Sequence, residues 1–453
     1  MPAPLTLQYA QFAGGWRDAV FPAASLEVAR LGFTDCIGVM LAGRREPAVT
    51  CLAAYVLAQG AHPRSRLATG NQRVGMVQAA LVNATAAHAL DYDDFAFSNH
   101  PSAVLVPTIL AAADASGASG AQMAAAYLVG YEVWADLMLR EQDLYYDKGW
   151  HPTAVLGPIG AAAAASVVLG LDAARTCHAL ALAASDSGGV FDNFGTMAKP
   201  YHGGRAAAAG LNAASLAAAG LQASASALEG RHGLMHALSP KNHVDLETPA
   251  RVGEIWRSAV MRLNIKKYPT VGASQRSIDA VLALNRRERL DPRRVRKIVA
   301  RISERHAAVM PHHLPQNALQ AKFSLEFAIA AALVHDAVGF NQLTDGVVRD
   351  ALIQQLMGLV RIESTAEFEP AWRDAAPFDI VVFTLDDGRE VATPQVRRAT
   401  GHADTPLANA ELWGKFLGCT EQAGVAQAQA RALFDAAQRI DALAGAHEIG
   451  LPA

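Results

Sequence analysis

The chain has few aromatic residues, few charged residues and few cysteines, and each shortage excludes a class of protein. Among its 453 residues, 7% are aromatic, 18% are charged and 51% are hydrophobic. That hydrophobic share excludes a disordered or fibrous chain. The formal net charge of −3 gives no electrostatic reason to expect a nucleic-acid partner. The four cysteines form no C-x-x-C pair, so neither a disulfide framework nor a structural zinc site is predicted.

Apolar runs typical of membrane spans are also missing. The uncharged run over residues 153–171 is long enough to cross a bilayer, but it is mostly Ala and Gly and contains Pro158. We expect this run, and the Ala-rich run over 206–228, to form buried core helices and to have no membrane contact. The N-terminal residues lack a charged segment followed by an apolar run, so we predict no signal peptide and a cytoplasmic location.

Alanine makes up about a fifth of the chain, and such small side chains let helices approach closely. Apolar residues at helical spacing, separated by Gly and polar residues, predict successive helices in residues 1–264, completed by helices in 396–453. The fold class is therefore predicted to be mainly α, with a large all-helical domain. The helices expected in its first part are 25–41, 78–90, 104–113, 120–139, 157–169 and 173–185.

The pattern changes near residue 264. Residues 295–302 are β-branched with basic residues between them, and 378–391 has the pattern of two strands joined by a tight turn. Residues 317–334 are expected to be helical. We therefore predict a smaller α+β domain over 265–395.

Motifs of common cofactor enzymes are absent from the sequence. It contains no G-x-x-x-x-G-K-[ST] loop, no G-x-S-x-G elbow and no H-E-x-x-H helix. We predict neither a metal nor an organic cofactor. Polar residues concentrate instead in four segments, which are 88–102, 144–153, 185–210 and 264–270.

The first segment, HALDYDDFAFSNHPS, holds three carboxylates and a histidine beyond them. Asp91, Asp93 and Asp94 are expected at the end of a helix, with His100 just after it. Asp91 and Asp94 are three residues apart, so a helix would place them on one face. A cap with exposed acids, or a metal site, is the alternative for this segment.

The second and third segments each place basic side chains next to an Ala-rich helix. His151 precedes Pro152 and can mark a helix N-terminus, which favours an anion, although a structural histidine is the alternative. Lys199 and His202 lie between a Gly-rich loop and a helix, where a lysine can lose solvation and become a base. The alternative there is a flexible loop with a solvated lysine.

The fourth segment, NIKKYPT, lies at the expected domain junction. Lys266 and Lys267 can offer positive charge to a carboxylated ligand in a cleft between domains. Two solvated lysines in a linker are the alternative.

Five strings, in this order and at these separations, resemble the MmgE/PrpD family: HALDYDD…HPS, GWHPTAVLG, FGTMAKPYHGGRAA, IKKYPT and AKFSLEF. The resemblance extends from about residue 5 to 440. The family includes 2-methylcitrate dehydratase, cis-aconitate decarboxylase and iminodisuccinate epimerase. It implies a large helical domain, a small α+β domain, a homodimer, and catalysis without metal or organic cofactor in a cleft between the domains.

The resemblance also implies site residues. Tyr146 falls where the epimerase has its tyrosine base, with Lys199 as the partner lysine. Five residues fall on positions that resemble the polar pocket of the decarboxylase branch: Asp91, His100, His151, Lys199 and Lys266. Further candidates for binding the substrate, beside Lys266, are His202, Asp93, Gly188 and Gly189.

Four positions depart from the family pattern. Phe95 stands where a Thr or Ser is common, and Gln275 replaces a frequent His. Val271 and Phe327 replace a His and a Tyr of the decarboxylase pattern. These changes remove hydrogen-bonding groups from the pocket region. They weaken the match to cis-aconitate decarboxylation and, to a lesser extent, the match to 2-methylcitrate dehydration.

The chemistry that the resemblance implies is removal of a proton next to a carboxylate. This step needs a positioned base, and cations or donors that hold the developing enediolate charge. We expect Lys199 or Tyr146 to move the proton on one face, with His151 or His100 as the acid on the other. The expected function is a dehydratase-type lyase, similar to 2-methylcitrate dehydratase, for a small di- or tricarboxylate. The alternatives are an epimerase of an iminodisuccinate-like dicarboxylate, a cis-aconitate-type decarboxylase and a catalytically inactive binding protein.

Overall fold

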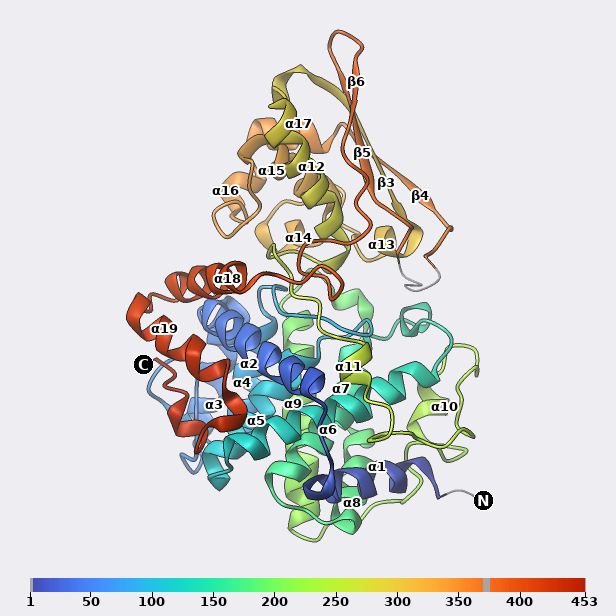
Figure 1. Cartoon of the computed structure of the whole chain (residues 1–453), viewed down its shortest axis with the longest axis vertical. Helices are drawn as coiled ribbons and strands as arrows, with labels where there is room; N and C mark the ends of the chain where they lie inside the picture. Colours follow the sequence, from blue (N-terminus) through green and yellow to red (C-terminus); the bar gives the residue numbers. More distant parts are fainter. Residues whose placement is uncertain (1–2, 370–374, 453) are drawn as a thin grey trace. The chain divides into compact units, whose positions relative to one another are not determined.

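The computed structural model describes residues 3–369 and 375–452, and the chain divides into two compact units (Figure 1). The first unit comprises Met1–Asn264 and Ala408–Ala453, and the second comprises Ile265–Leu407. The regular secondary structure of the first unit is almost all helical, and the second combines helices with a small sheet. This confirms the predicted fold class, mainly α with a smaller α+β part.

The first unit is a helical assembly with one short antiparallel strand pair, β1 (Ser65–Arg66) and β2 (Arg73–Val74). The six helices expected in its first part are confirmed, with ends that differ by at most five residues from the predicted ones. The helices are α1 (Leu5–Gly14), α2 (Ala23–Gly43), α3 (Pro47–Gln59), α4 (Met76–His88), α5 (Pro101–Ser116), α6 (Gly120–Arg140), α7 (Pro152–Val168), α8 (Ala173–Ser185), α9 (Ala198–Ala218), α10 (Leu234–Leu238), α11 (Arg257–Val260), α18 (Asn409–Gln422) and α19 (Gln427–Ala437).

Helix α9 lies at the centre of the first unit, in contact with α4, α7 and α8. Two glycines on α9 explain how closely its neighbours approach. A Cβ on Gly204 would lie 2.1 Å from Thr85 Oγ1 of α4, and a Cβ on Gly210 would lie 2.4 Å from Ala161 Cβ of α7. A larger residue at either position would push the helices apart, because the interior is already close-packed. The small residues therefore fix α9, which carries Lys199, against α4 and α7.

The uncharged run over residues 153–171 lies mostly in α7, whose residues are all buried, as expected. Among the described residues, no helix has both the length and the apolar character needed to cross a membrane. The Ala-rich run over 206–228 is only partly helical. Helix α9 ends at Ala218, and Gly220 has a φ of +101°, which a helix cannot accommodate. The expected continuation of this helix to residue 228 is therefore wrong.

The C-terminal helices pack on the first unit. Figure 1 shows α18 and α19, in red, beside α2, in blue. Phe416 of α18 lies directly over Gly38 of α2, where a Cβ would come within 2.9 Å of the ring. Lys415 of α18 has its Nζ 2.6 Å from Asp35 Oδ1 of α2, and it donates a hydrogen bond to the Tyr92 carbonyl at 2.8 Å. These contacts connect α18 to the acidic loop after α4, which holds Asp91, Asp93 and Asp94.

The second unit is a four-stranded sheet with helices packed on one side of it (Figure 1). The strand order is β4-β3-β5-β6, in which β3 is parallel to β4 and antiparallel to β5. The strand predicted over 295–302 and the hairpin predicted over 378–391 are confirmed. The elements are α12 (Gln275–Glu288), β3 (Val295–Ser303), α13 (Glu304–Ala308), α14 (Ala318–Ala321), α15 (Leu325–His335), α16 (Asp345–Val348), α17 (Ala351–Met357), β4 (Val360–Thr365), β5 (Ile380–Leu385) and β6 (Glu390–Ala392).

Two details of the second unit differ from expectation. The single helix expected over 317–334 is interrupted, because the Lys322 carbonyl accepts the Val271 N–H at 3.0 Å and Ser324 begins a new helix as its N-cap. The second unit also extends to Leu407, and not only to residue 395. The Gly401 carbonyl accepts the Ile265 N–H at 2.8 Å, so the segment after β6 is tied to the start of this unit.

Candidate active site

Polar side chains from four helices and one loop of the first unit form a continuous network of contacts. His88 is the last residue of α4, and the aspartates follow in the loop. His100 and His151 directly precede α5 and α7. Lys199 and His202 lie at the start of α9. The network therefore brings together the predicted residues Asp91, Asp93, His100, His151, Lys199 and His202.

His100 and His151 occupy the same position in two helices, since each is an N-cap followed by a proline. Proline suits the first helical position because its missing N–H would have no helical partner there. The His100 N–H donates to Thr153 Oγ1 at 3.2 Å, which joins the two helix starts. The N-terminal ends of long helices favour anions, so this arrangement suits a carboxylate. The prediction that His151 marks a helix start is confirmed.

The acidic segment is a buried loop. Helix α4 ends at His88, and Asp91 has a φ of +49°, so the expected common helix face for Asp91 and Asp94 is wrong. Asp91, Asp93 and Asp94 are each at most 3% exposed, so the alternative of exposed acids is also wrong. Burial, reinforced by the Asp35 carboxyl, raises the pKa of Asp94 well above its usual range.

Lys199 is buried in direct contact with two members of this segment. Its Nζ lies 2.5 Å from Asp91 Oδ1 and 2.9 Å from His88 Nε2. Burial, together with the nearby Lys199 charge, lowers the pKa of His88 to about 4. His88 is therefore neutral near pH 7 and can accept a hydrogen bond from the Lys199 ammonium. The alternative of a solvated lysine is wrong, because Lys199 is only 3% exposed.

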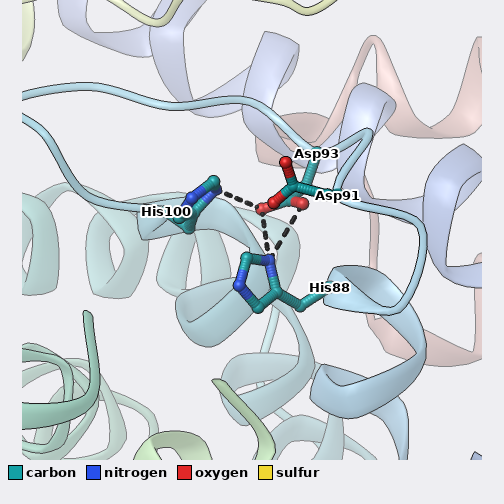
Figure 2. Close-up of side chains that lie close together, drawn as sticks. All are labelled: His88, Asp91, Asp93 and His100. Carbon is teal, nitrogen blue, oxygen red and sulfur yellow. Dashed lines mark hydrogen bonds and ion pairs between the residues drawn. The ribbon is translucent and has the colours of Figure 1, made fainter. Parts of the chain in front are cut away.

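Asp93 lies between two imidazoles (Figure 2). His88 Nδ1 lies 3.0 Å from Asp93 Oδ1, and His100 Nδ1 lies 2.8 Å from Asp93 Oδ2. Burial alone would raise the pKa of this carboxyl, but the two imidazoles outweigh it and hold the pKa well below the usual range. Asp93 is therefore ionised, and His88 donates its Nδ1–H to it.

His151 and His202 form a second hydrogen-bonded pair in the network. Their Nδ1 atoms are 3.1 Å apart, so one nitrogen carries the hydrogen and the other accepts it. Burial, then the Lys199 charge, lowers the pKa of His151 well below its usual range. Burial and the nearby His88 lower the pKa of His202 to about 4. His151 is therefore neutral, whereas the acid role expected for it requires a protonated imidazole.

Two family models cover most of the chain. The MmgE/PrpD N-terminal domain matches residues 8–247, and the MmgE/PrpD C-terminal domain matches residues 268–439. The chain belongs to the MmgE/PrpD family. The resemblance seen in the five sequence strings is thereby confirmed.

Relatives within the MmgE/PrpD family carry names that indicate an activity. Cis-aconitate decarboxylase of Mus musculus is 29% identical over 359 residues, which cover 76% of this chain and 72% of the relative. The Homo sapiens protein of the same name matches with the same identity and coverage. Cis-aconitate decarboxylase of Aspergillus terreus is 25% identical over 372 residues, 76% of this chain and 75% of the relative.

Tyr146, which the family resemblance singles out, belongs to a group of aromatic residues beside Lys199. The Lys199 Nζ lies 5.1 Å from the centre of the Phe194 ring, and Tyr146 packs edge-on against the same ring at 6.2 Å. His151 contacts that ring as well, at 4.9 Å. Tyr146 therefore belongs to an aromatic cluster around Phe194, which Lys199 and His151 also contact.

Gly188 and Gly189 lie next to the start of α7. The Gly189 carbonyl accepts the His151 N–H at 3.0 Å, and the Gly188 carbonyl accepts from Arg205 at 3.1 Å. A Cβ on Gly189 would lie 2.4 Å from Ala154 Cβ, so the close approach of this loop to α7 requires glycine. The glycines thus hold His151 in place, and a role in carboxylate binding remains a prediction.

Lys266 belongs to the second unit, whereas the network described here is formed by the first. It is 2% exposed, so the alternative of a solvated linker lysine is wrong for Lys266. Gln275 stabilises the turn that follows Lys266, because its Oε1 accepts the N–H groups of Lys267 and Tyr268, each at 3.1 Å. Its Nε2 donates to the Tyr268 carbonyl at 3.0 Å.

The other departures from the family pattern also have structural partners. Phe327 is fully buried in the hydrophobic core of the second unit, and Val271 packs against the same core. Phe95 exchanges backbone hydrogen bonds with Asn264, at 3.0 and 2.9 Å. At these positions the side chain or the backbone stabilises the fold.

His88 is the central residue that sequence reasoning did not single out, although it begins the first string. The signal was the spacing His88-x-x-x-x-Asp93 at a helix end, but only the turn that reverses the chain brings these two side chains together. Asp35 and Lys415 were missed for a different reason, because they come from opposite ends of the sequence.

Four side chains of the network are of the kinds that bind metal ions. One ligand atom from each of His88, Asp91, Asp93 and His100 lies within 4.8 Å of the others. Lys199, however, places its Nζ against Asp91 and His88, and an ammonium beside a divalent cation would be strongly repelled. In addition, His88 Nδ1 carries a hydrogen toward Asp93. These residues therefore fit a proton-transfer network better than a metal centre.

We predict that catalytic activity survives exhaustive chelation. Dialysis against a chelator should leave kcat/KM within roughly twofold of the untreated enzyme, because Lys199 supplies the local positive charge that a metal would otherwise supply. Turnover and metal content are measured on the same preparation. A loss that zinc, iron or magnesium restores would contradict the prediction.

Proposed function

We propose that this chain is a lyase that acts, without metal or organic cofactor, on a small di- or tricarboxylate by removing the proton next to a carboxylate. The observation that carries this proposal is the buried Lys199, held between Asp91 and His88 and flanked by the neutral His151. This arrangement combines a fixed positive charge and an uncharged base in a site shielded from water. Those are the two groups that enediolate chemistry requires.

The proposed roles follow from the charges of the residues. His151 takes the proton from the carbon, and the Lys199 ammonium offsets the charge that develops on the carboxylate oxygens. In a dehydration, the electron pair then forms the double bond and expels the β-hydroxyl as water. His100 donates the proton that this hydroxyl needs, because the Asp93 carboxylate 2.8 Å away stabilises its imidazolium form.

Dehydration is the outcome we favour, with decarboxylation as the second candidate. The relatives' names favour decarboxylation of a tricarboxylate. The departures at Val271 and Phe327 weigh against decarboxylation, because these residues replace a His and a Tyr of the decarboxylase pattern and offer no hydrogen-bonding side chain. An epimerase would use Tyr146 with Lys199. We also predict, from the sequence, a homodimer and a cytoplasmic location.

Incubation with 2-methylcitrate, citrate, cis-aconitate and iminodisuccinate tests this proposal. We expect an alkene product and loss of water from a hydroxylated tricarboxylate, detected by NMR and ultraviolet absorbance. Release of CO₂ from cis-aconitate identifies the decarboxylase instead, and inversion of iminodisuccinate identifies the epimerase. Reaction of none of the four would contradict the lyase proposal and favour an inactive binding protein.

A further inference from the structure

We propose that Asp93 and His88 are positioning residues: Asp93 holds His88 in the one tautomer whose Nε2 accepts a hydrogen bond from Lys199, and His88 thereby fixes the ammonium against Asp91. The proposal rests on the function proposed above, in which Lys199 is the cation that stabilises the reacting carboxylate. It concerns the network behind Lys199, and it assigns Asp93 to that network instead of to direct substrate binding.

The hydrogens of His88 can be assigned from its partners. Its Nδ1 lies 3.0 and 3.2 Å from the two oxygens of Asp93, and an ionised carboxylate can only accept. The Nδ1 therefore carries the hydrogen. The ring is neutral, since burial and the Lys199 charge lower its pKa to about 4. Its Nε2 then has a lone pair, which faces the Lys199 Nζ at 2.9 Å.

The opposite tautomer would break two contacts at once. It would leave Nδ1 without a hydrogen for Asp93, and it would point an N–H at the Lys199 ammonium. Because all of these groups are buried, water cannot replace the lost hydrogen bonds at low cost. The carboxylate of Asp93 thus determines the direction of the hydrogen bond that Lys199 makes on the other side of the ring.

Asp91, His151 and His202 also lie near Lys199, and their roles differ from that of His88. Asp91 contacts its Nζ from the acidic loop, His151 faces it from α7, and His202 lies one turn along α9. His151 and His202 bond to each other through their Nδ1 atoms. Asp91 supplies the opposite charge to Lys199, and His88 supplies a neutral acceptor. Both contacts help to orient the ammonium.

A purely structural role for His88 makes a different prediction. The ring packs against His100 with their centres 4.4 Å apart, so it also fills space. If packing alone mattered, leucine at this position would preserve most of the activity of a folded enzyme. Glutamine would be no better than leucine. If acceptance of the Lys199 hydrogen matters, glutamine should retain more activity than leucine, because its Oε1 can accept.

The test uses His88→Leu, His88→Gln and the nearly isosteric Asp93→Asn, with the exposed His62→Gln as the matched control. We expect kcat to fall roughly 10²-fold in His88→Leu and in Asp93→Asn, with a smaller change in KM. We expect His88→Gln to recover part of kcat. The alkaline limb of the kcat profile should move to lower pH by about one unit in His88→Leu, because the ammonium has lost an acceptor. His62→Gln should change none of these quantities.

A measurement without substrate separates this inference from the proposed function. The chain contains eight lysines, so the Lys199 amine can be followed by NMR of isotope-labelled lysine and assigned with Lys199→Arg. We expect its titration midpoint to fall by about one pH unit in His88→Leu. An unchanged midpoint in folded His88→Leu, or equal kcat in the leucine and glutamine variants, would overturn the inference. If the wild type turns over no carboxylate, the proposed function fails, and the NMR titration still decides the positioning claim.

Discussion

Replacing Lys199 with alanine is expected to lower kcat/KM by roughly 10²–10⁴-fold, the usual contribution of a charge stabiliser or an acid–base group. The side chain is 3% exposed and contacts both Asp91 and His88, so no solvent ion can take its place. The exposed Lys241→Ala is the control, and it should retain wild-type turnover.

Loss of Lys199 also leaves the Asp91 carboxylate buried without its cation, which destabilises the fold. A second variant separates the loss of catalysis from the loss of stability. Lys199→Met combined with Asp91→Asn replaces the ion pair by neutral groups, so its melting temperature should exceed that of Lys199→Ala. Its activity should remain lost. A neutral double variant with wild-type stability and near-normal turnover would contradict a catalytic role for the pair.

Replacing Lys415 with methionine is expected to lower the melting temperature by roughly 3–8 °C. The Lys415 side chain is 5% exposed and lies 2.6 Å from the fully buried Asp35. Removing one partner of a buried ion pair typically costs about 3–5 kcal/mol, because the other charge is left uncompensated. The substitution also removes the hydrogen bond to the Tyr92 carbonyl, so the loop carrying Asp91 and Asp93 should become less ordered.

The matched test for Lys415 uses the double variant Lys415→Met with Asp35→Asn. It should regain part of the lost stability, since the unpaired charge is gone. The exposed Lys241→Met should change the melting temperature by less than about 1 °C. Calorimetry and turnover are compared at one protein concentration. Equal melting temperatures for Lys415→Met and the wild type would show that the pair does not hold the C-terminal helices in place.

The sequence predicts the helical part of the fold well, because its signals are local. Glycine and polar punctuation place α8 at Ala173–Ser185 as expected, and Pro152 marks the start of α7. Local signals fail where a distant segment competes for hydrogen bonds. Helix 317–334 is interrupted because the Lys322 carbonyl bonds to Val271, a partner that no local pattern can reveal.

The same difference between local signals and distant contacts applies to the candidate site. His151 and Lys199 can be found from sequence because a His-Pro pair and a Gly-rich loop mark helix starts. The acidic loop could not be placed, since the left-handed conformation at Asp91 turns the chain and breaks the helical spacing. The protonation states could not be predicted either. They depend on burial and on contacts such as that of His88 with Lys199, which form only in the folded chain.

The most direct test of the central claim is exchange of the substrate Cα–H with solvent deuterium, followed by NMR in heavy water for the four carboxylates named above. With at least one of them, the account predicts that the wild type incorporates deuterium into the substrate or product, or that its turnover rate differs between water and heavy water. It predicts at least 10²-fold slower exchange in the folded Lys199→Met, Asp91→Asn variant. Exchange at equal rates in both proteins, or none with any of the four in the wild type, would contradict the account.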